Sequence, residues 1–357
     1  MSNSLKQIRA RIDVLDQRLL KLLSARARLA QHIGKLKDLK DGTAYRPERE
    51  AQILRGVIAA NRGPLTDAAL ARLFTEVMSA CRALEDSMKV AYLGPQGTFS
   101  QEAAVKQFGG SASLSPCTSI DEVFRQVETG TVGYGVVPVE NSTEGAIGRT
   151  LDLLLSTPAK VCSEVMLPIR QCLMSKSGKL ADIRKVVSHT QSLAQCQQWL
   201  ARSLPRTERA AVVSNAEAAR LAARDRHAAA IGPRMAAELY GLKLVARNIE
   251  DEAKNTTRFL VIAQHDAAPS GKDKSSLILS TRNVPGAMHE LLTPLAANHV
   301  SMTRLESRPS RAGMWEYVFY VDIEGHQQDP NVTRALAELK QKASFLKNLG
   351  SYPAAVA

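Results

Sequence analysis

Three cations lie along an apolar stretch near the N-terminus, at a spacing that could hold a small anion. They are Arg9, Arg26 and Lys37. On a helix, Arg26 and Lys37 are close to three full turns apart, so they share a face and lie roughly 16 Å apart along its axis. Their side chains could converge on one anion. Arg9 lies roughly 25 Å from Arg26, so a second subunit would have to supply it to the same site. All three could instead be solvated cations without a binding role.

Polar side chains follow several short apolar runs in the middle of the chain. The candidates are Thr98, Glu140, Asn141, Ser142, Ser188, His189, Gln191, Thr257 and Arg258. Open α/β sheets bind ligands at the carboxyl ends of their strands, and a guanidinium matches the geometry of a carboxylate. These segments therefore indicate an anion-binding cleft, although each polar group could instead satisfy a turn or cap a helix.

The first 88 residues have the apolar period of helices. Apolar residues recur every three or four positions from Leu5 to about Lys40. Pro47 suits the first turn of a second helix, and Thr66 or Asp67 can cap a third. The first helix would be roughly 50 Å long, more than one small domain can cover. We therefore expect a partner helix from another subunit, and so a homodimer or a higher homo-oligomer.

The pattern changes at Lys89 to short apolar runs followed by glycine, which is typical of an α/β domain. The candidate strands are 89–93, 133–139, 162–167, 171–174, 185–187, 228–231 and 259–262. Small and charged residues at 267–274 indicate a linker. Beyond it, the order strand, helix, strand, strand, helix, strand predicts an α+β ferredoxin-like unit. The predicted domains are thus 1–88 (all-α), 89–266 (α/β) and 275–357 (α+β), joined by the linker 267–274.

The composition is that of a soluble globular protein of several domains. The chain has 357 residues, 45% of them hydrophobic, and a formal net charge of +12, which favours an anionic partner. No stretch is long and apolar enough for a membrane span or has the layout of a signal peptide, so we expect a cytoplasmic protein. The five cysteines are scattered and form no CxxC pair, which predicts reduced core thiols and no metal site.

The N-terminal residues resemble a known enzyme family. The run from Ile8 to Leu20, Ala25-Arg26, Gly34 to Lys37 and Tyr45 to Glu50 are similar to the all-helical chorismate mutases, over nearly all of residues 5–88. The resemblance implies that Arg26 and the partner's Arg9 hold the two carboxylates of chorismate and that Lys37 faces the ether oxygen. It also implies that Arg49 supports the site, that Glu50 meets the ring hydroxyl, and that Glu85 supplies one further group.

These residue types suit a pericyclic rearrangement. Such a reaction needs no nucleophile, so the enzyme has to fix the reactive geometry and stabilise negative charge on the ether oxygen. Cations do both. An ionised carboxylate would repel that oxygen, so we expect Glu85 to assist only when it is protonated.

Four segments of the middle domain together resemble prephenate dehydratase over roughly 89–265. They are Gly94 to Ser100, Glu140 to Gly145, Ser188 to Cys196 and Asn255 to Phe259. The resemblance implies two lobes arranged like a periplasmic binding protein, with the substrate in the cleft and Thr257 as the main catalytic residue. Loss of water and CO2 leaves an aromatic ring, so we expect no cofactor. We predict that Thr257 donates a hydrogen bond to the departing hydroxyl, with Glu140 or His189 as a relay, and that Arg258 neutralises a substrate carboxylate.

Two motifs of the last domain are similar to those of the ACT regulatory domains that bind phenylalanine. The resemblance covers 275–352 and implies an allosteric site and feedback inhibition by L-phenylalanine. Its residues are Gly286, Ala287, Met288, Glu306, Ser307, Arg308 and Pro309. Met288 stands where leucine is usual, which is a volume-conserving change.

The favoured interpretation is therefore a bifunctional enzyme that acts on chorismate and prephenate, with no nucleic-acid or membrane partner. A nucleic-acid-binding protein would need basic clusters with aromatic platforms, whereas aromatic residues are 4% of the chain. Two further interpretations are a non-catalytic amino-acid sensor and an enzyme that prefers arogenate to prephenate. The Thr257-Arg258-Phe259 run disfavours the sensor, and the fused mutase disfavours the preference for arogenate.

Overall fold

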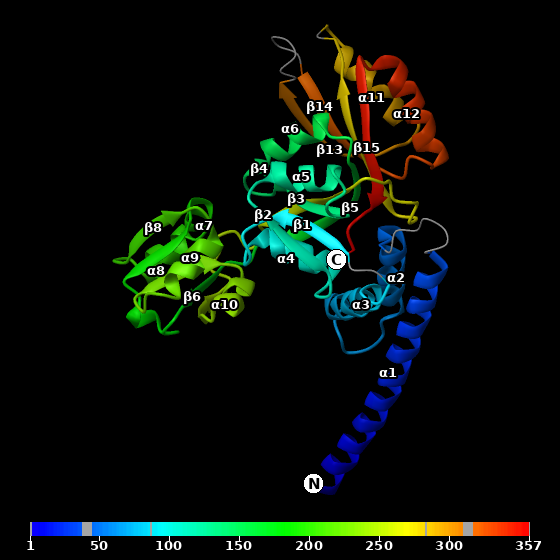
Figure 1. Cartoon of the computed structure of the whole chain (residues 1–357). Coiled ribbons are helices and arrows are strands. Elements are labelled where there is room, and N and C mark those ends of the chain that lie inside the picture. Colours follow the sequence, from blue (N-terminus) through cyan, green and yellow to red (C-terminus); the bar gives the residue numbers. More distant parts are fainter. Residues whose placement is uncertain (1, 38–44, 86–87, 283, 310–316, 357) are drawn as a thin grey trace.

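The computed structural model describes residues 2–37, 45–85, 88–282, 284–309 and 317–356. Three structural parts follow one another along the chain: a helical part, a middle part of two lobes and a C-terminal sheet with two helices (Figure 1). Among the described residues, no helix is long and apolar enough to cross a membrane.

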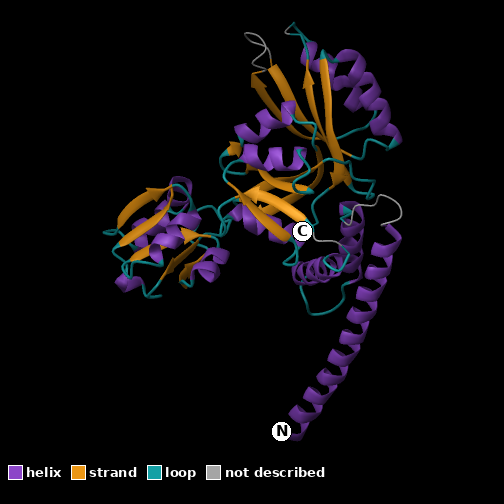
Figure 2. Ribbon diagram, in the orientation of Figure 1, coloured by secondary structure: helices purple, strands orange, loops and turns teal. Residues whose placement is uncertain are grey.

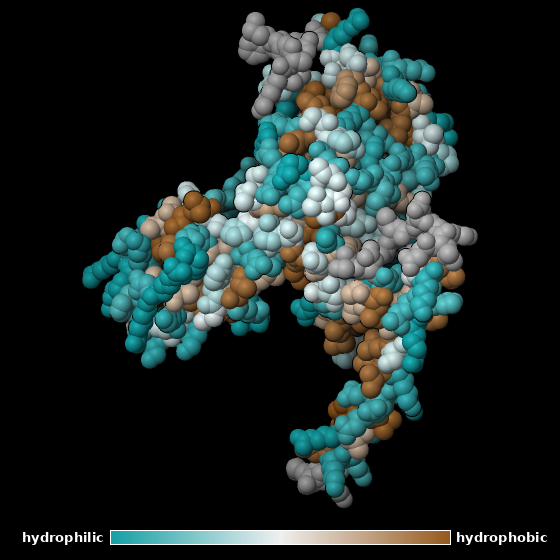
Figure 3. Space-filling view, in the orientation of Figure 1, coloured by the Kyte–Doolittle hydropathy of each residue, from teal (hydrophilic) through white to brown (hydrophobic). Residues whose placement is uncertain are grey.

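The helical part contains three helices, α1 (Ser2–Lys37), α2 (Pro47–Ala60) and α3 (Asp67–Arg82). Pro47 begins α2, and the Thr66 hydroxyl caps α3 by accepting from the Ala69 N–H at 3.2 Å. The long helix α1 projects from the body of the molecule, and its apolar side chains are exposed along its length (Figure 3). Leu22, for example, is 69% exposed. The predicted three helices are confirmed.

The first lobe is a mixed sheet of order β2-β1-β3-β11-β5, with the short β4 paired to β3. Its strands are β1 (Lys89–Leu93), β2 (Ser113–Cys117), β3 (Tyr134–Asn141), β4 (Gly145–Ala146), β5 (Lys160–Pro168) and β11 (Thr256–Ala263). Helix α4 (Phe99–Phe108) packs into one core cluster, and α5 (Ile120–Glu128) and α6 (Gly148–Ser156) pack into another. The helices therefore cover opposite faces of the sheet.

The second lobe is a sheet of order β10-β6-β9-β7-β8. Its strands are β6 (Cys172–Ser175), β7 (Lys185–His189), β8 (Glu208–Val212), β9 (Ala228–Gly232) and β10 (Lys243–Arg247). Its helices are α7 (Thr190–Gln195), α8 (Gln197–Ser203), α9 (Asn215–Ala222) and α10 (Arg234–Tyr240). The chain enters this lobe after β5 and leaves it before β11, so the two lobes are joined by two crossings, as the two-lobed prediction requires.

The C-terminal part has strand order β13-β14-β12-β15 and the predicted alternation of strands and helices. The elements are β12 (Asp273–Ser280), α11 (Ala287–Ala297), β13 (Met302–Pro309), β14 (Tyr317–Glu324), α12 (Pro330–Lys342) and β15 (Phe345–Pro353). Helices α11 and α12 cover one face of this sheet (Figure 2). The other face packs on the first lobe, where Tyr320 and Tyr352 share a core with Leu151 and Val161.

The sequence does not predict four of the strands: the two-residue β4 and the edge strands β2, β8 and β10. Edge strands are half exposed and carry no continuous apolar run, so their pattern is weak. The segment 267–274 also differs from a flexible linker. Ser270 and Asp273 are buried and joined by hydrogen bonds, and Asp273 already begins β12.

Candidate active sites

The helical part contains a cavity of about 440 Å³ between α1, α2 and α3. Of the predicted residues, Arg26, Arg49, Glu50 and Glu85 line it. The remaining lining residues are Arg46, Arg82, Leu29, Ala30, Ile33, Ile53, Met78 and Cys81. Four arginines against two carboxylates make the cavity suited to a small dianion.

Arg82 is the residue of this cavity that sequence reasoning missed. It lies on the buried face of α3 and forms an ion pair with Glu50. It also donates to the Phe108 carbonyl at 2.6 Å, and its guanidinium carbon lies 5.3 Å from the centre of the Tyr45 ring. Burial lowers the pKa of Arg82. A cation on the apolar face of α3, one turn before Glu85, is the signal that could have identified it.

One predicted residue of this site, Arg9, lies elsewhere, and the side chain of another, Lys37, is outside the described residues. Arg9 is exposed on α1, roughly 25 Å along the axis from Arg26, and does not line the cavity of its own chain. Lys37 is the last residue of α1, and its side chain lies outside the described residues. The cavity of a single chain is therefore not lined by the whole predicted set.

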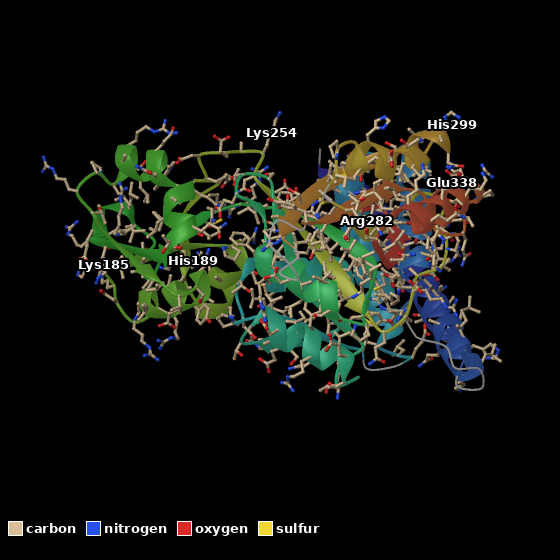
Figure 4. All side chains as sticks on the ribbon, turned by 90° about the horizontal axis from the view of Figure 1, so that it is seen from above. Lys185, His189, Lys254, Arg282, His299 and Glu338 are labelled. Atoms are coloured by element: carbon tan, nitrogen blue, oxygen red, sulfur yellow. The ribbon has the colours of Figure 1, made fainter. Side chains whose placement is uncertain are left out.

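A second cavity, of about 410 Å³, lies between the two lobes of the middle part. Of the predicted residues, Asn141, His189, Gln191 and Thr257 line it. The other lining residues are Leu93, Phe99, Ser100, Ile120, Pro138, Glu144, Gly145, Ala146, Ile147, Ile169, Gln171, Ser192, Gln195 and Asn215. Seen from above, His189 lies in the second lobe, far from Arg282 and Glu338 of the C-terminal part (Figure 4).

Thr257 and Asn141 face each other across β11 and β3 at the ends of these strands. The Asn141 side-chain amide donates to the Thr257 hydroxyl oxygen and to Asn255 Oδ1, both at 2.8 Å. Its carbonyl oxygen accepts from the Thr143 hydroxyl at 2.6 Å, which fixes the orientation of the amide. Because the Thr257 oxygen accepts this bond, its own hydrogen is available for donation into the cleft.

His189 ends β7 and caps α7, and its Nδ1 accepts from the Gln191 N–H at 3.3 Å. The neutral ring then carries its hydrogen on Nε2. His189 and Thr257 come from different lobes and line the same cavity, so the cleft can present two hydrogen-bond donors to one ligand.

Three other predicted residues support the cleft without lining it. The Thr98 hydroxyl caps α4 by accepting from the Gln101 N–H at 3.4 Å. The Ser142 hydroxyl accepts from the Thr256 N–H at 3.0 Å. Ser188 is buried and donates to the Ile231 carbonyl at 2.7 Å. These contacts fix the loops and strand ends around the cavity.

Glu140 and Arg258 point away from the cleft, which does not fit the roles predicted for them. Each precedes or follows a cleft residue on its strand, and successive side chains of a strand alternate between its two faces. Arg258 forms ion pairs with Glu164 and Asp322, while Arg304 of β13 lies 2.9 Å from Glu140. Burial opposes the charge of Arg258, but Tyr352, Asp322 and Glu164 outweigh it and raise its pKa.

Gln171 is a cleft residue that sequence reasoning missed. It is 1% exposed, and its amide nitrogen donates to Ser192 Oγ and to Gln195 Oε1, both at 3.1 Å. Its carbonyl oxygen has no hydrogen-bond partner among the described residues. The sequence around Gln171 does not predict a role in the cleft, because only the fold brings this residue beside α7.

The predicted regulatory residues lie at one end of the C-terminal sheet, where β12 and β13 terminate. Gly286 has a left-handed φ of 81° before α11, and Ala287 and Met288 begin that helix. Glu306, Ser307, Arg308 and Pro309 end β13. Since β12 and β13 both run antiparallel to β14, they run parallel to each other. The segments that follow them therefore emerge at the same end of the sheet. Arg308 also lies 3.3 Å from Asp152 of α6.

Comparison with known proteins matches each part of the chain to a family. Chorismate mutase type II matches residues 8–86, prephenate dehydratase matches 90–267, and the ACT domain matches 275–341. A bifunctional chorismate mutase/prephenate dehydratase of Neisseria gonorrhoeae is 53% identical over 97% of this chain and 96% of its own length. The chain belongs to the bifunctional chorismate mutase/prephenate dehydratase family.

Other members of this family match over nearly the whole chain. The enzyme of Aquifex aeolicus is 43% identical over 99% of this chain and 98% of its own, and that of Escherichia coli K12 is 34% identical over 98% and 96%. Among solved structures, the prephenate dehydratase of Arthrobacter aurescens in complex with L-Phe is 32% identical. It covers 76% of this chain and 93% of its own with a TM-score of 0.68. A quorum-quenching acylase, GqqA, is 29% identical with a TM-score of 0.69, over 75% and 98%.

The predicted activities are therefore confirmed. The chain is a chorismate mutase, which rearranges chorismate to prephenate, and a prephenate dehydratase, which converts prephenate to phenylpyruvate for phenylalanine biosynthesis. Family membership decides against the nucleic-acid-binding and sensor interpretations.

Proposed function

We propose that the helical cavity binds chorismate through residues of two subunits. Arg26 of one subunit and Arg9 of the partner would hold the two carboxylates, Lys37 would face the ether oxygen, and Arg49 would support the site. Glu50, oriented by Arg82, would meet the ring hydroxyl. The support is that four arginines line the cavity of one protomer, while Arg9 lies on the exposed helix too far away to reach it.

We also propose that α1 is the main dimer contact. Its apolar stripe is solvent-exposed in the single chain, from Leu5 (54% exposed) to Leu36 (54% exposed). An apolar stripe of this length on a helix that projects from the body is stabilised when a second helix covers it. A homodimer that pairs the two α1 helices would also bring the partner's Arg9 near Arg26.

In the dehydratase cleft, Thr257 donates a hydrogen bond to the hydroxyl group that leaves prephenate. The observation that carries this assignment is the bond from the Asn141 amide to the Thr257 oxygen, because it aims the hydroxyl hydrogen away from Asn141. As the carbon–carboxylate bond breaks, its electrons aromatise the ring and expel the hydroxyl. The departing oxygen leaves with the electron pair of its bond to the ring, as hydroxide. His189 Nε2–H lines the same cavity and is proposed as the second hydrogen-bond donor to that oxygen.

Thr257→Ala and Thr257→Ser test this role. Loss of one hydrogen-bond donor to developing negative charge costs roughly 10²–10³ in kcat. We expect that loss in Thr257→Ala, whereas Thr257→Ser keeps the hydroxyl and most of the turnover. Mutase activity of the same chain is the folding control. Dehydratase turnover near wild type in Thr257→Ala would overturn the assignment.

We further propose that L-phenylalanine binds the ACT domain and inhibits the enzyme. Two observations support this proposal. Gly286 to Met288 and Glu306 to Pro309 lie at the same end of the ACT sheet, and the Arthrobacter relative was solved in complex with L-Phe. Coupling between such sites is typically about 1–3 kcal/mol. Isothermal titration of phenylalanine and a dehydratase assay with and without it measure the two sides of that coupling. The cytoplasm is the proposed location, since all five cysteines are free and buried.

A further inference from the structure

Four charged residues join the dehydratase domain to the ACT domain directly behind the cleft. Arg258 and Glu140 are cross-strand neighbours on β11 and β3, and Arg304 and Asp322 are cross-strand neighbours on β13 and β14. Between the two sheets, Arg258 pairs with Asp322, and Arg304 Nε lies 2.9 Å from Glu140 Oε2. We call these four residues the charge quartet. Each sheet thus presents one cation and one anion to the opposite charges of the other.

The Arg258 side of the quartet is buried and saturated with partners. Arg258 is 8% and Asp322 is 4% exposed. Arg258 also contacts Glu164 Oε2 and the Tyr352 hydroxyl, both at 2.8 Å, and Asp322 accepts from the Ser276 hydroxyl at 2.5 Å. A buried ionic network with this many bonds has one geometry, so it holds its residues rigidly.

The Arg304 side is held more loosely. The side chain of Glu140 is 39% exposed and that of Arg304 is 11% exposed. The short Arg304–Glu140 contact is an ion pair without hydrogen-bond alignment, and Arg304 Nη2 has no hydrogen-bond partner among the described residues. A shift of β13 is therefore resisted less on this side than on the Arg258 side.

The quartet lies one residue away from the catalytic pair. Thr257 precedes Arg258 and Asn141 follows Glu140, and the two cleft residues are themselves cross-strand neighbours. The β11–β3 register shifts between Arg258 and Phe259, so the regular ladder is interrupted beside them. Such irregularities re-aim side chains next to active sites. Beside this interruption, Arg258 and Glu140 on the far face tie the strand ends to the ACT sheet through their ion pairs.

We propose that Arg304 and Asp322 of the ACT domain are positioning residues for the dehydration. Through Glu140 and Arg258 they fix the strand ends that carry Asn141 and Thr257. This inference rests on the role proposed above for Thr257. It makes the ACT domain part of the catalytic support of the dehydratase, and it gives any displacement of the ACT sheet a direct mechanical route to the cleft.

A double-mutant cycle on the more exposed pair tests the proposal. Full-length Arg304→Gln, Glu140→Gln and the double variant are assayed for kcat and KM with prephenate and for mutase activity. Displacements of about 1 Å cost up to about 10²-fold, so we expect kcat to fall roughly 10- to 100-fold in each single variant, with KM and mutase activity close to wild type. The double variant should be no worse than either single one, because both remove the same contact. Arg304→Lys, which keeps the charge, should recover part of kcat.

Lys347→Met is the matched control. Lys347 of β15 also joins the ACT domain to the first lobe, donating to the carbonyls of Leu154, Leu155 and Thr157, but it lies away from the catalytic pair. Its loss should lower the melting temperature and leave kcat unchanged. If Lys347→Met lowers kcat as much as Arg304→Gln does, or if Arg304→Gln and Glu140→Gln keep wild-type kcat, the proposal is wrong.

Thr257→Ala in the same series separates this inference from the proposed function. A loss of turnover in Thr257→Ala, with wild-type kcat in Arg304→Gln, removes only the positioning role. Wild-type turnover in Thr257→Ala overturns both. Because Glu140 is the more exposed member of its pair, Glu140→Gln perturbs folding least and keeps the test decisive if Arg304→Gln does not fold.

Discussion

Replacing Arg258 by methionine separates its two possible roles, in substrate binding and in holding two domains together. The change removes the charge and leaves Asp322 and Glu164 buried, at 4% and 3% exposed. Glu164 keeps the Lys274 ammonium at 2.8 Å. Among the described residues, Arg258 is the only cation that forms an ion pair with Asp322, so the change leaves this carboxylate without an ionic partner. Removing one partner of a buried ion pair typically costs about 3–5 kcal/mol.

That cost should appear as a fall of about 10 °C in the melting transition of the dehydratase and ACT domains, because 1 kcal/mol shifts Tm by about 2–4 °C at this size. Differential scanning calorimetry measures it, and the KM for prephenate is measured on the same sample below the transition. Arg234→Met is the control. Arg234 pairs with Glu238 on the surface, both side chains being more than half exposed, so its loss should cost less than about 1 kcal/mol.

The opposite result would refute the reasoning. If Arg258→Met raised the KM tenfold or more and left the melting temperature unchanged, the guanidinium would be a substrate ligand, as the family resemblance implied. A large fall in both the melting temperature and kcat, with KM unchanged, agrees with an interdomain role that also supports Thr257.

Three further predictions concern other parts of the chain. Leu22→Asp should weaken the proposed contact between the α1 helices of two subunits, since burying a leucine stabilises by about 1.5–3 kcal/mol. Analytical ultracentrifugation should then show monomers, and the variant should lose mutase activity and keep dehydratase activity. Glu85→Gln should keep mutase activity, because the amide can donate a hydrogen bond and carries no charge that would repel the ether oxygen. Burial raises the pKa of Glu102, more than Lys106 lowers it, so its ionisation costs stability as the pH rises through the folded pKa. Glu102→Gln should therefore raise Tm at pH 7, with the gain vanishing below about pH 4.

Each of these has a contrary outcome. Leu22→Asp that remains dimeric would mean that α1 is covered by something other than a second α1. Loss of mutase activity in Glu85→Gln would mean that the site needs the negative charge of Glu85. A Glu102→Gln variant that is less stable at pH 7 would mean that the Lys106 charge outweighs the burial of the carboxyl.

The sequence alone predicted the three N-terminal helices, the two helices of the last domain and the interior strands. These depend on local period and on turn residues, such as Pro47 at the start of α2 and Thr66 at the cap of α3. The edge strands β2, β8 and β10 were not predicted, because each pairs with only one neighbouring strand and its residues show no local apolar pattern.

The same division applies to the sites. Sequence motifs were enough to predict residues that line the two cavities, namely Thr257, Asn141, His189, Arg26 and Arg49, because each motif lies at a strand end or on a helix face that local structure already fixes.

Tertiary structure alone decided that Arg258 faces the ACT domain, one residue from Thr257. The alternation of a strand shows that the two side chains point to opposite faces, but not which face meets the substrate. That depends on which sheet packs on which, through contacts between residues as far apart as Arg258 and Tyr352. It is a property of the assembled domains, and no local pattern encodes it.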